Sequence, residues 1–172
     1  MAAMTAKPAL WRQMTAADLQ AVSELAAAIH PDFPEDDAVF VERLWLYPAG
    51  CHVLAREDAL AAYVVSHPWI ARQPPALNDL LGALPDKPST YYIHDLALAP
   101  AARGSGAGGT IVTQLAALAR SEALPTMSLV AVNGSERFWQ RQGFAATAVP
   151  ELATKLRSYS DDACFMVRTL QA

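Results

Sequence analysis

The stretch YYIHDLALAPAARGSGAGGTIVTQLAALAR, from Tyr91 to Arg120, decides how this chain folds. Its first part, Tyr91–Leu98, consists mostly of aromatic and branched apolar residues, which predicts a strand. Pro100 ends that strand, because proline has no N–H group to donate to a neighbouring strand. A glycine-rich turn follows, and beyond it apolar residues recur at helical spacing. The stretch therefore predicts a strand, a glycine-rich turn and an amphipathic helix.

The glycine-rich turn, Arg103–Gly109, has the composition of an anion-binding site. The first N–H groups of a helix have no partners within it, and the helix dipole places partial positive charge there. Glycines lack the Cβ atoms that would hold a phosphate away, and Arg103 adds a full positive charge. The turn therefore predicts a cradle for a diphosphate. The alternative is a flexible surface loop with a helix cap, which so many glycines directly before a helix disfavour.

The spacing of the glycines limits the kind of diphosphate. Gly104, Gly106 and Gly109 formally fit the dinucleotide fingerprint Gly-x-Gly-x-x-Gly. That motif, however, requires its first glycine at the strand end and an acidic residue closing a second strand, whereas the nearest acid here, Glu122, ends the helix. The nucleotide-triphosphate loop is excluded because no Gly-Lys-Ser/Thr follows. A third pattern, Arg/Gln-x-x-Gly-x-Gly/Ala, fits Arg103–Gly108 better.

A second motif lies further along the chain. Asn133–Phe144, with the sequence NGSERFWQRQGF, contains an asparagine, a short predicted helix and a Gly-Phe pair. Together with Leu96–Pro100 and Arg103–Gly108, this segment resembles the core of the GNAT acetyltransferase superfamily, which binds acetyl-CoA. The resemblance covers Tyr91–Phe144 well and the rest as a pattern of elements. It implies one GNAT-like domain over residues 1–172, an α/β fold with a central mixed sheet whose parallel strands splay apart between flanking helices.

The predicted order of elements agrees with that fold. We expect a short strand at Leu10–Arg12, a helix from the N-cap Thr15 to Ile29, a helix over Asp36–Leu46, and a hairpin of Cys51–Arg56 and Ala59–Ser66. After the hairpin we expect an irregular segment over His67–Pro88 with helical turns at Asn78–Leu84, the central stretch, a parallel strand over Met127–Val132, a helix over Ser135–Gln142, a strand over Phe144–Ala148, an irregular segment over Val149–Asp162 and a closing strand over Cys164–Leu170.

The composition excludes several classes of function. The chain has 172 residues, 53% of them hydrophobic and 17% charged, so it is long and apolar enough for a folded core. Its net charge of −4 argues against a nucleic-acid partner. Cys51 and Cys164 make neither a disulfide framework nor a metal motif. No signal peptide or membrane-spanning run is recognisable, so we expect a cytoplasmic monomer or homodimer without metal or membrane partner.

The resemblance implies where acetyl-CoA would bind. The pantetheine arm would add to the strand Tyr91–Leu98 as an extra strand, through backbone groups around Leu96 and Leu98. The pyrophosphate would meet the N–H groups of the turn. Asn133 would hold the arm from the other side, although a helix cap or turn residue fits Asn133 equally. The residues expected to contact the cofactor are Leu96, Ala97, Leu98, Arg103, Gly104, Ser105, Gly106, Ala107, Gly108, Gly109, Asn133 and Phe138.

Acetyl transfer to an amine requires a proton acceptor, because a free amine is mostly charged at neutral pH. Tyr92 and His94 lie two residues apart on the central strand and so share one face. Members of the superfamily often place the base, or a residue holding a relaying water, at these positions. His94 fits equally a core histidine hydrogen-bonded within the sheet. Asp95 is expected on the opposite face unless a bulge turns it.

The usual acid of the superfamily is a tyrosine in the helix before Gly-Phe, and this sequence has Trp139 there. An indole N–H cannot release a proton as a phenol can, so we expect Trp139 to pack or to shape the pocket, and Tyr159 is the candidate substitute. The acceptor should meet the first helices and the long irregular segment, where Glu35 and Asp36 could attract a cationic amine. The candidate acceptor residues are His30, Phe33, Glu35, Trp45, His67 and Trp69.

Three functions remain open on this basis. The favoured one is an N-acetyltransferase that moves the acetyl group of acetyl-CoA to a primary amine of a small molecule or peptide, by direct attack in a ternary complex. A non-catalytic CoA-binding or regulatory module on the same fold is the alternative that the missing tyrosine keeps open. A nicotinamide-dependent oxidoreductase is disfavoured by the missing acidic residue.

Overall fold

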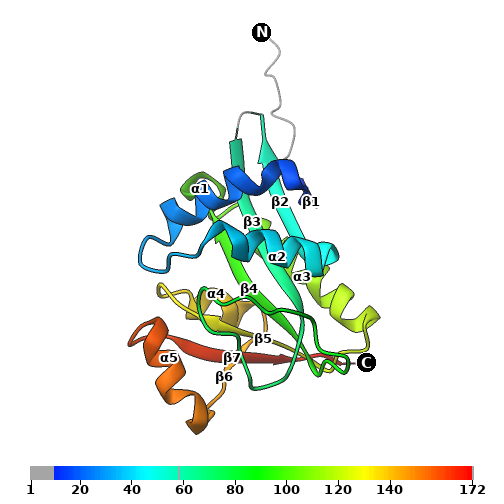
Figure 1. Ribbon diagram of the computed structural model, residues 1–172, viewed down its shortest axis with the longest axis vertical. Helices are drawn as coiled ribbons and strands as arrows, with labels where there is room; N and C mark the ends of the chain where they lie inside the picture. The colour runs from blue at the N-terminus through cyan, green and yellow to red at the C-terminus, as the bar shows by residue number, and fades with distance from the viewer. Residues whose placement is uncertain (1–9, 58, 172) are drawn as a thin grey trace.

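The computed structural model describes residues 10–57 and 59–171, which form a mixed α/β fold around one sheet (Figure 1). Within these residues the sheet has seven strands in the order β1-β2-β3-β4-β5-β7-β6. β4 and β5 are parallel, and the other neighbouring strands are antiparallel. The predicted mixed sheet is therefore confirmed. The expectation about a signal peptide falls on residues 1–9 and lies outside the described residues.

The bounds of the elements are as follows. The strands are β1 (Trp11–Gln13), β2 (Cys51–Arg56), β3 (Ala59–Trp69), β4 (Thr90–Leu98), β5 (Thr126–Ala131), β6 (Ala145–Ala146) and β7 (Cys164–Thr169). The helices are α1 (Leu19–Ile29), α2 (Asp37–Leu46), α3 (Ala107–Ser121), α4 (Glu136–Arg141) and α5 (Ala153–Tyr159). Short 3₁₀ turns lie at Ala16–Asp18, Pro48–Gly50, Pro100–Ala102 and Pro150–Leu152.

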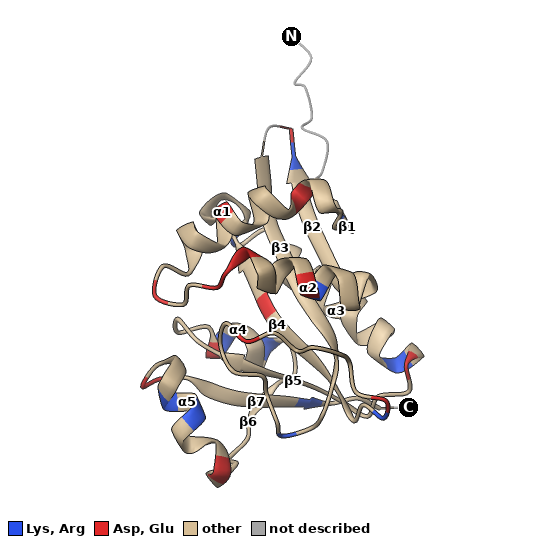
Figure 2. Ribbon diagram, in the orientation of Figure 1, with Lys and Arg blue, Asp and Glu red and all other residues tan. Residues whose placement is uncertain are grey.

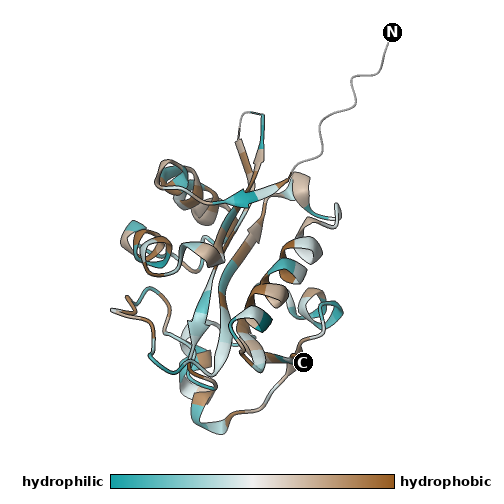
Figure 3. Ribbon diagram, turned by 90° about the vertical axis from the view of Figure 1, so that its right-hand side faces the viewer, coloured by the Kyte–Doolittle hydropathy of each residue, from teal (hydrophilic) through white to brown (hydrophobic). Residues whose placement is uncertain are grey.

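Helices cover both faces of the sheet. In the view of Figure 3, α1 and α2 lie on one side of the strands and α3 lies on the other. The core under α3 joins Ile111 and Leu115 to Tyr91 of β4 and to Trp139 of α4. The core under α1 and α2 is separate and includes Val22, Phe40, Tyr63 and Val65. Because each helix presents its apolar stripe to the sheet, β4 lies between two packed layers.

β4 changes its pairing halfway along. Val65 of β3 pairs with Asp95, and the next residue of β3 pairs with Ile93, which leaves His94 as an extra residue of β4. On one side of this bulge Ile93 packs under α3, and on the other side Ala97 packs under α1 and α2. A bulge shifts the alternation of side chains by one residue. It therefore turns Asp95 to the face that carries His94, which is the exception that the sequence analysis allowed.

The parallel strands β4 and β5 separate soon after they meet. They pair only through Tyr91 with Met127 and Tyr92 with Ser128. Beyond Tyr92, the edge of β4 that faces β5 has no strand partner among the described residues over Ile93–Leu98. The predicted splay of the central strands is thus present: no strand of the described residues pairs with this edge, and the carbonyl of Leu98 accepts a hydrogen bond from Nε of Arg103.

The segment between β3 and β4 differs from its prediction in two ways. β3 continues through Pro68 to Trp69, where the prediction ended the strand at Ser66. Pairing with β2 stops at Val65, so Pro68 has a strand neighbour on one side only and can lack an N–H group there. The helical turns predicted over Asn78–Leu84 are wrong. The N–H groups of Leu81 and Gly82 bond instead to the carboxylate of Glu42 on α2, at 2.6 and 3.0 Å.

The segment Val149–Asp162, predicted to be irregular, contains a 3₁₀ turn and the helix α5. Leu152 and Leu156 lie four residues apart and pack with Phe165 of β7. A stripe of two leucines is too short to show helical periodicity in the sequence, which explains the error. α5 is important for the site because Tyr159 is its last residue. The strand predicted over Phe144–Ala148 shortens to β6.

Candidate active site

A cleft of about 800 Å³ opens where β4 and β5 separate, in front of the N-terminus of α3. Ser105 does not line it; its hydroxyl donates to the carbonyl of Ala102 and accepts from the N–H of Ala107, so it acts within the turn. The residues predicted to contact CoA that do line the cleft are Leu96, Ala97, Leu98, Arg103, Gly104, Gly106, Ala107, Gly108, Gly109, Asn133 and Phe138.

The glycines shape the turn before α3 in two ways. Gly104 and Gly106 have φ angles of +76° and +83°, a region that other residues enter only with strain. A Cβ added to either would meet no atom within 4 Å, so both border open space. A Cβ on Gly108 would lie 2.9 Å from the ring of Phe138. Gly104 and Gly106 therefore make the turn, and Gly108 allows Phe138 to pack against the helix.

Two arginines line the cleft. Arg103 was predicted, whereas Arg141, the last residue of α4, was missed. Its place depends on how α4 packs beside α3, which no local motif encodes. The N–H groups at the start of α3 and these two cations make an anion-binding end. The residues present thus fit the diphosphate of CoA.

Two smaller cavities lie beside the cleft, toward α1 and α2. The inner pocket brings together the three predicted catalytic residues, and it is lined by His30, Phe33, Glu35, Leu77, Tyr92, His94, Asp95, Val130, Val132 and Tyr159. The outer pocket, of about 250 Å³, is lined by Ser23, Ala26, Ala27, His30, Pro31, Phe33, Pro34, Glu35, Phe40 and Asp95. The loop between α1 and α2 and the bulge of β4 therefore form a common wall of both pockets.

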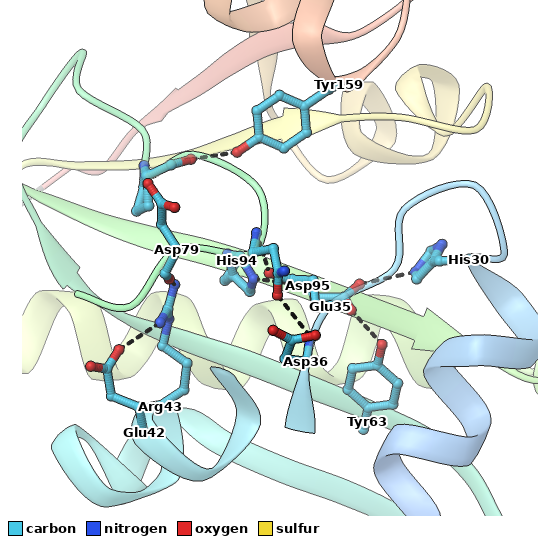
Figure 4. Close-up of polar contacts among 12 residues, drawn as sticks. His30, Glu35, Asp36, Glu42, Arg43, Tyr63, Asp79, His94, Asp95 and Tyr159 are labelled. Carbon is cyan, nitrogen blue, oxygen red and sulfur yellow. Dashed lines mark hydrogen bonds and ion pairs between the residues drawn. The ribbon is translucent and has the colours of Figure 1, made fainter. Parts of the chain in front are cut away.

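Two histidine–carboxylate pairs occupy this wall (Figure 4). Nε2 of His94 lies 2.7 Å from Oε1 of Glu35, and both side chains are almost fully buried. Nε2 of His30 lies 3.0 Å from Oδ1 of Asp95, and these side chains are 16% and 15% exposed. The hydroxyl of Tyr63 donates to the other oxygen of Asp95. The sequence placed His30 and Glu35 only on the acceptor side, because pairs between residues 59 and 65 positions apart are visible only in three dimensions.

The comparisons with known proteins identify the family. The sequence model of the Acetyltransferase (GNAT) family matches residues 19–144. The chain belongs to this family. No curated protein sequence matches the chain.

Solved structures share the GNAT fold with this chain. The loading GNATL domain of CurA from Lyngbya majuscula has a TM-score of 0.79 and 13% identity, covering 96% of this chain and 99% of that one. The GphF GNAT-like decarboxylase in complex with isobutyryl-CoA has a TM-score of 0.74 and 18% identity, covering 94% and 100%. The NatC complex bound to Gag peptide and CoA has a TM-score of 0.69 and 16% identity, covering 96% and 100%. At these identities the likeness concerns the fold alone.

The electrostatics of this GNAT site follow from burial and from the two carboxylates. Burial disfavours charge on His30, but the hydrogen bond and charge of Asp95, with the charge of Glu35, raise its pKa above 6.5. Burial raises the pKa of the Tyr92 hydroxyl and that of the Tyr159 hydroxyl. Both tyrosines are therefore neutral phenols at physiological pH and can donate a hydrogen bond or a proton.

Trp139 packs in this GNAT chain rather than presenting an acid. It is 6% exposed, and its ring meets Phe138 at 4.9 Å and Phe144 at 5.3 Å between centroids, each edge to face. It also lines the cleft beside Leu129. The side chain thus joins the core under α3 to the wall of the cleft.

Three of the candidate acceptor residues do not reach the pockets. Trp45 is 83% exposed on α2, and the indole of Trp69 donates to the carbonyl of Gln73. His67 is buried within the sheet, where burial lowers its pKa to about 3. Only His30, Phe33 and Glu35 of that group line the cavities.

Searches for a metal site and for a membrane span find neither in residues 10–57 and 59–171. No group of three or more His, Cys, Asp or Glu side chains there is placed to hold an ion. No helix there has the length and apolar character needed to cross a bilayer.

Proposed function

We propose that this protein transfers the acetyl group of acetyl-CoA to a primary amine of a small molecule or peptide, by direct attack of the amine in a ternary complex. The observation that carries the proposal is the continuity of the site. The cleft that contains the glycine turn shares His30 and Asp95 with two pockets; both pockets are lined by Glu35, and the inner one also by the neutral phenols of Tyr92 and Tyr159. Membership of the GNAT family supports acyl transfer as the reaction.

In this proposal the cleft holds acetyl-CoA. The N–H groups of the turn, with Arg103 and Arg141, bind the pyrophosphate. The pantetheine arm extends along the free edge of β4 over Ile93–Leu98, as an added strand would. Two of the similar structures contain isobutyryl-CoA or CoA, which supports this use of the cleft. An N–H group of β4 near Leu96 is the proposed donor to the thioester oxygen, where negative charge develops.

The pockets are proposed to receive the amine. Figure 2 shows acidic residues on the segment that leads into α2 and on β4, the two elements that wall both pockets. Glu35 and Asp95 attract an ammonium group, and each holds a histidine whose ring can accept a proton. Tyr92 and His94 stay predicted catalytic residues beside the reacting nitrogen. Tyr159 stays the predicted acid for the departing thiolate. Its hydroxyl donates to the carbonyl of Pro75 and burial raises its pKa, so it would have to leave that carbonyl and would give up its proton less readily than a free phenol.

A CoA-binding module without catalysis is the second candidate. Trp139 stands where the superfamily usually has its tyrosine acid, and it is packed between two phenylalanines. A thiolate leaves tolerably well without an acid, so we favour the enzyme. One similar structure is a GNAT-like decarboxylase, so the activity assay described next also includes malonyl-CoA, an acyl-CoA that can lose carbon dioxide.

Two measurements test the proposal. Acetyl-CoA and CoA should raise the melting temperature while NAD does not, because only a ligand of the native state stabilises it. Acetyl-CoA with a panel of primary amines should then release thiol only when an amine is present. Binding without turnover would support the module, and consumption of malonyl-CoA without an amine would support decarboxylation. An unchanged melting temperature at millimolar acetyl-CoA would contradict the use of the cleft.

A further inference from the structure

His30 lies where the three cavities meet. It follows the last residue of α1, and it lines the cleft, the inner pocket and the outer pocket. Asp95 is the only other residue that lines all three of these cavities. A group that moves a proton between an acceptor amine and solvent needs such a position, with access from both sides.

The partners of His30 fix which ring nitrogen carries the proton. Nε2 faces Asp95, whose ionised carboxylate can only accept, so Nε2 carries a hydrogen. In the neutral ring Nδ1 then has a free lone pair, and it lies 2.9 Å from Nδ2 of Asn133, which donates to it. Asp95 is held in turn by the hydroxyl of Tyr63. The lone pair of His30 is therefore oriented toward the cleft side of the wall.

The Asn133 amide occupies the place of a substrate N–H group. Asn133 is exposed at the end of the strand β5 and has a φ angle of +56°. An amine arriving at Nδ1 would replace one N–H donor by another, and the released amide can bond to water. The exchange therefore leaves no buried polar group without a partner.

His94 is less well placed for the same task. Its side chain is only 3% exposed and Nε2 is occupied by Glu35. Its Nδ1 is buried and has no hydrogen-bond partner among the described residues. His94 also lines the cleft and the inner pocket, but its Nδ1 is buried, whereas Nδ1 of His30 bonds to the exposed Asn133 and His30 borders the outer pocket as well.

We propose that His30, oriented by Asp95, is the base that takes the proton of the acceptor amine, an inference that rests on the proposed acetyl transfer. Nδ1 removes one proton from the ammonium group and passes it to solvent. The amine nitrogen then bonds to the thioester carbon and the carbon–sulfur bond breaks. The second proton that nitrogen loses goes to the thiolate, so the products are an amide, CoA and one proton.

The charges around His30 predict how this base titrates. Asp95 on β4 and Glu35 on the loop before α2 favour its protonated form, burial and Arg103 of the glycine turn oppose it, and their balance raises its pKa. The neutral phenol of Tyr63 faces Asp95 rather than the ring. Activity should therefore fall on the acid side through an apparent pKa above 6.5.

The test compares four variants by their pH profiles of kcat/KM for acetyl-CoA with tyramine, histamine, phenethylamine or cadaverine. His30→Gln should lower kcat/KM about 10²-fold at neutral pH and abolish the decline of kcat/KM toward acid pH, which we call the acid limb. Part of the lost kcat/KM should return at high pH, where the amine deprotonates without a base. Asp95→Asn should keep the limb but move it to lower pH. His94→Gln should keep the limb in place. His52→Gln, at a histidine of β2 that lines none of the three cavities, should leave the profile unchanged.

The outcomes distinguish a wrong assignment of the base from a wrong assignment of the reaction. If acetyl-CoA still raises the melting temperature of every variant, misfolding is excluded as the cause of a change in activity. If wild type turns over and His30→Gln keeps its acid limb, or His94→Gln loses it, the assignment to His30 is overturned while acetyl transfer stands. If wild type binds acetyl-CoA but releases no thiol with any amine, both proposals fail.

Discussion

Gly106 begins α3 with a left-handed backbone, and its α-carbon borders open space in the cleft. Gly106→Val should weaken CoA binding about tenfold or more, because the side chain would enter the phosphate end of the cleft and strain the turn. The fold should remain, since no neighbouring atom obstructs the new Cβ. Isothermal titration with CoA measures the effect.

Gly82 provides the matched control. It also has a positive φ, +76°, and open space at its Cβ position, but it lies in the segment between β3 and β4 and lines none of the three cavities. Gly82→Val should lose similar stability, about 1–2 kcal/mol, and keep its CoA affinity. Equal CoA affinities for the two variants would contradict the cradle.

Trp139→Phe tests the role of the residue that replaces the usual tyrosine. Phenylalanine keeps much of the contact with Phe138 and Phe144, so the free energy of unfolding should fall by roughly 0.5–3 kcal/mol while turnover changes little. Urea unfolding and steady-state rates measure the two effects. A loss of turnover of about tenfold or more in a folded variant would show that the indole acts in the reaction.

An ion pair joins β1 to the turn before α1. Arg12 donates two hydrogen bonds of 2.8 Å to Asp18, which also accepts from the N–H of Thr15. The hydrogen bond from Arg12, with that from Thr15, lowers the pKa of Asp18 from 3.8 to about 2. A carboxylate with a lowered pKa stabilises the fold above its unfolded pKa, and that contribution disappears as pH falls through the folded value.

Asp18→Asn should therefore destabilise the protein at neutral pH, and the difference from wild type should shrink between pH 3.8 and about 2. Chemical unfolding at a series of pH values measures the free energy of unfolding of both proteins and hence this difference. Glu24→Gln removes an exposed carboxylate of α1 that accepts a hydrogen bond from Gln20 and serves as control. A difference that stays constant down to pH 2 would show that the carboxylate charge is not responsible.

The elements with strong local signals could be predicted from the sequence. β4, the glycine turn and α3 have patterns long enough to place them within a residue or two. α5 could not, because Leu156 and Leu152 of the preceding 3₁₀ turn pack against Phe165 of β7 and form no helical stripe long enough to see in the sequence. The segment between β3 and β4 could not either, since Glu42 and Arg43 of α2 bind its backbone across distant parts of the chain.

In the site, too, residues of one motif could be predicted from the sequence, whereas residues brought in by tertiary packing could not. Residues of one continuous motif, such as Leu96, Gly106 and Gly108, could be predicted to belong to one site, and they line one cleft. His30 and Arg141 entered the site through tertiary packing, and Asp95 through a bulge of one residue. No spacing rule in the sequence encodes these three, because each depends on how helices and strands meet.

The charge of the pockets predicts the class of acceptor. The residues that line the inner and outer pockets include Glu35 and Asp95 but no lysine or arginine. The carboxylate of an amino acid would find like charges and no cation there. We therefore expect a higher kcat/KM for the amines tyramine, histamine and phenethylamine than for the amino acids tyrosine, histidine and phenylalanine. Glu35→Gln should reduce this difference in kcat/KM. Equal or better turnover of the amino acids would contradict this view of the pockets.

The central claim is that the cleft and the pockets together move an acetyl group to an amine. The most direct measurement incubates the wild-type protein with acetyl-CoA carrying an isotopically labelled acetyl group and the amine panel, and identifies products by mass spectrometry. We predict a labelled N-acetyl amine in an amount equal to the thiol released. Acetyl-CoA that binds in the cleft but never labels an amine, at any pH that leaves the protein folded, would contradict it.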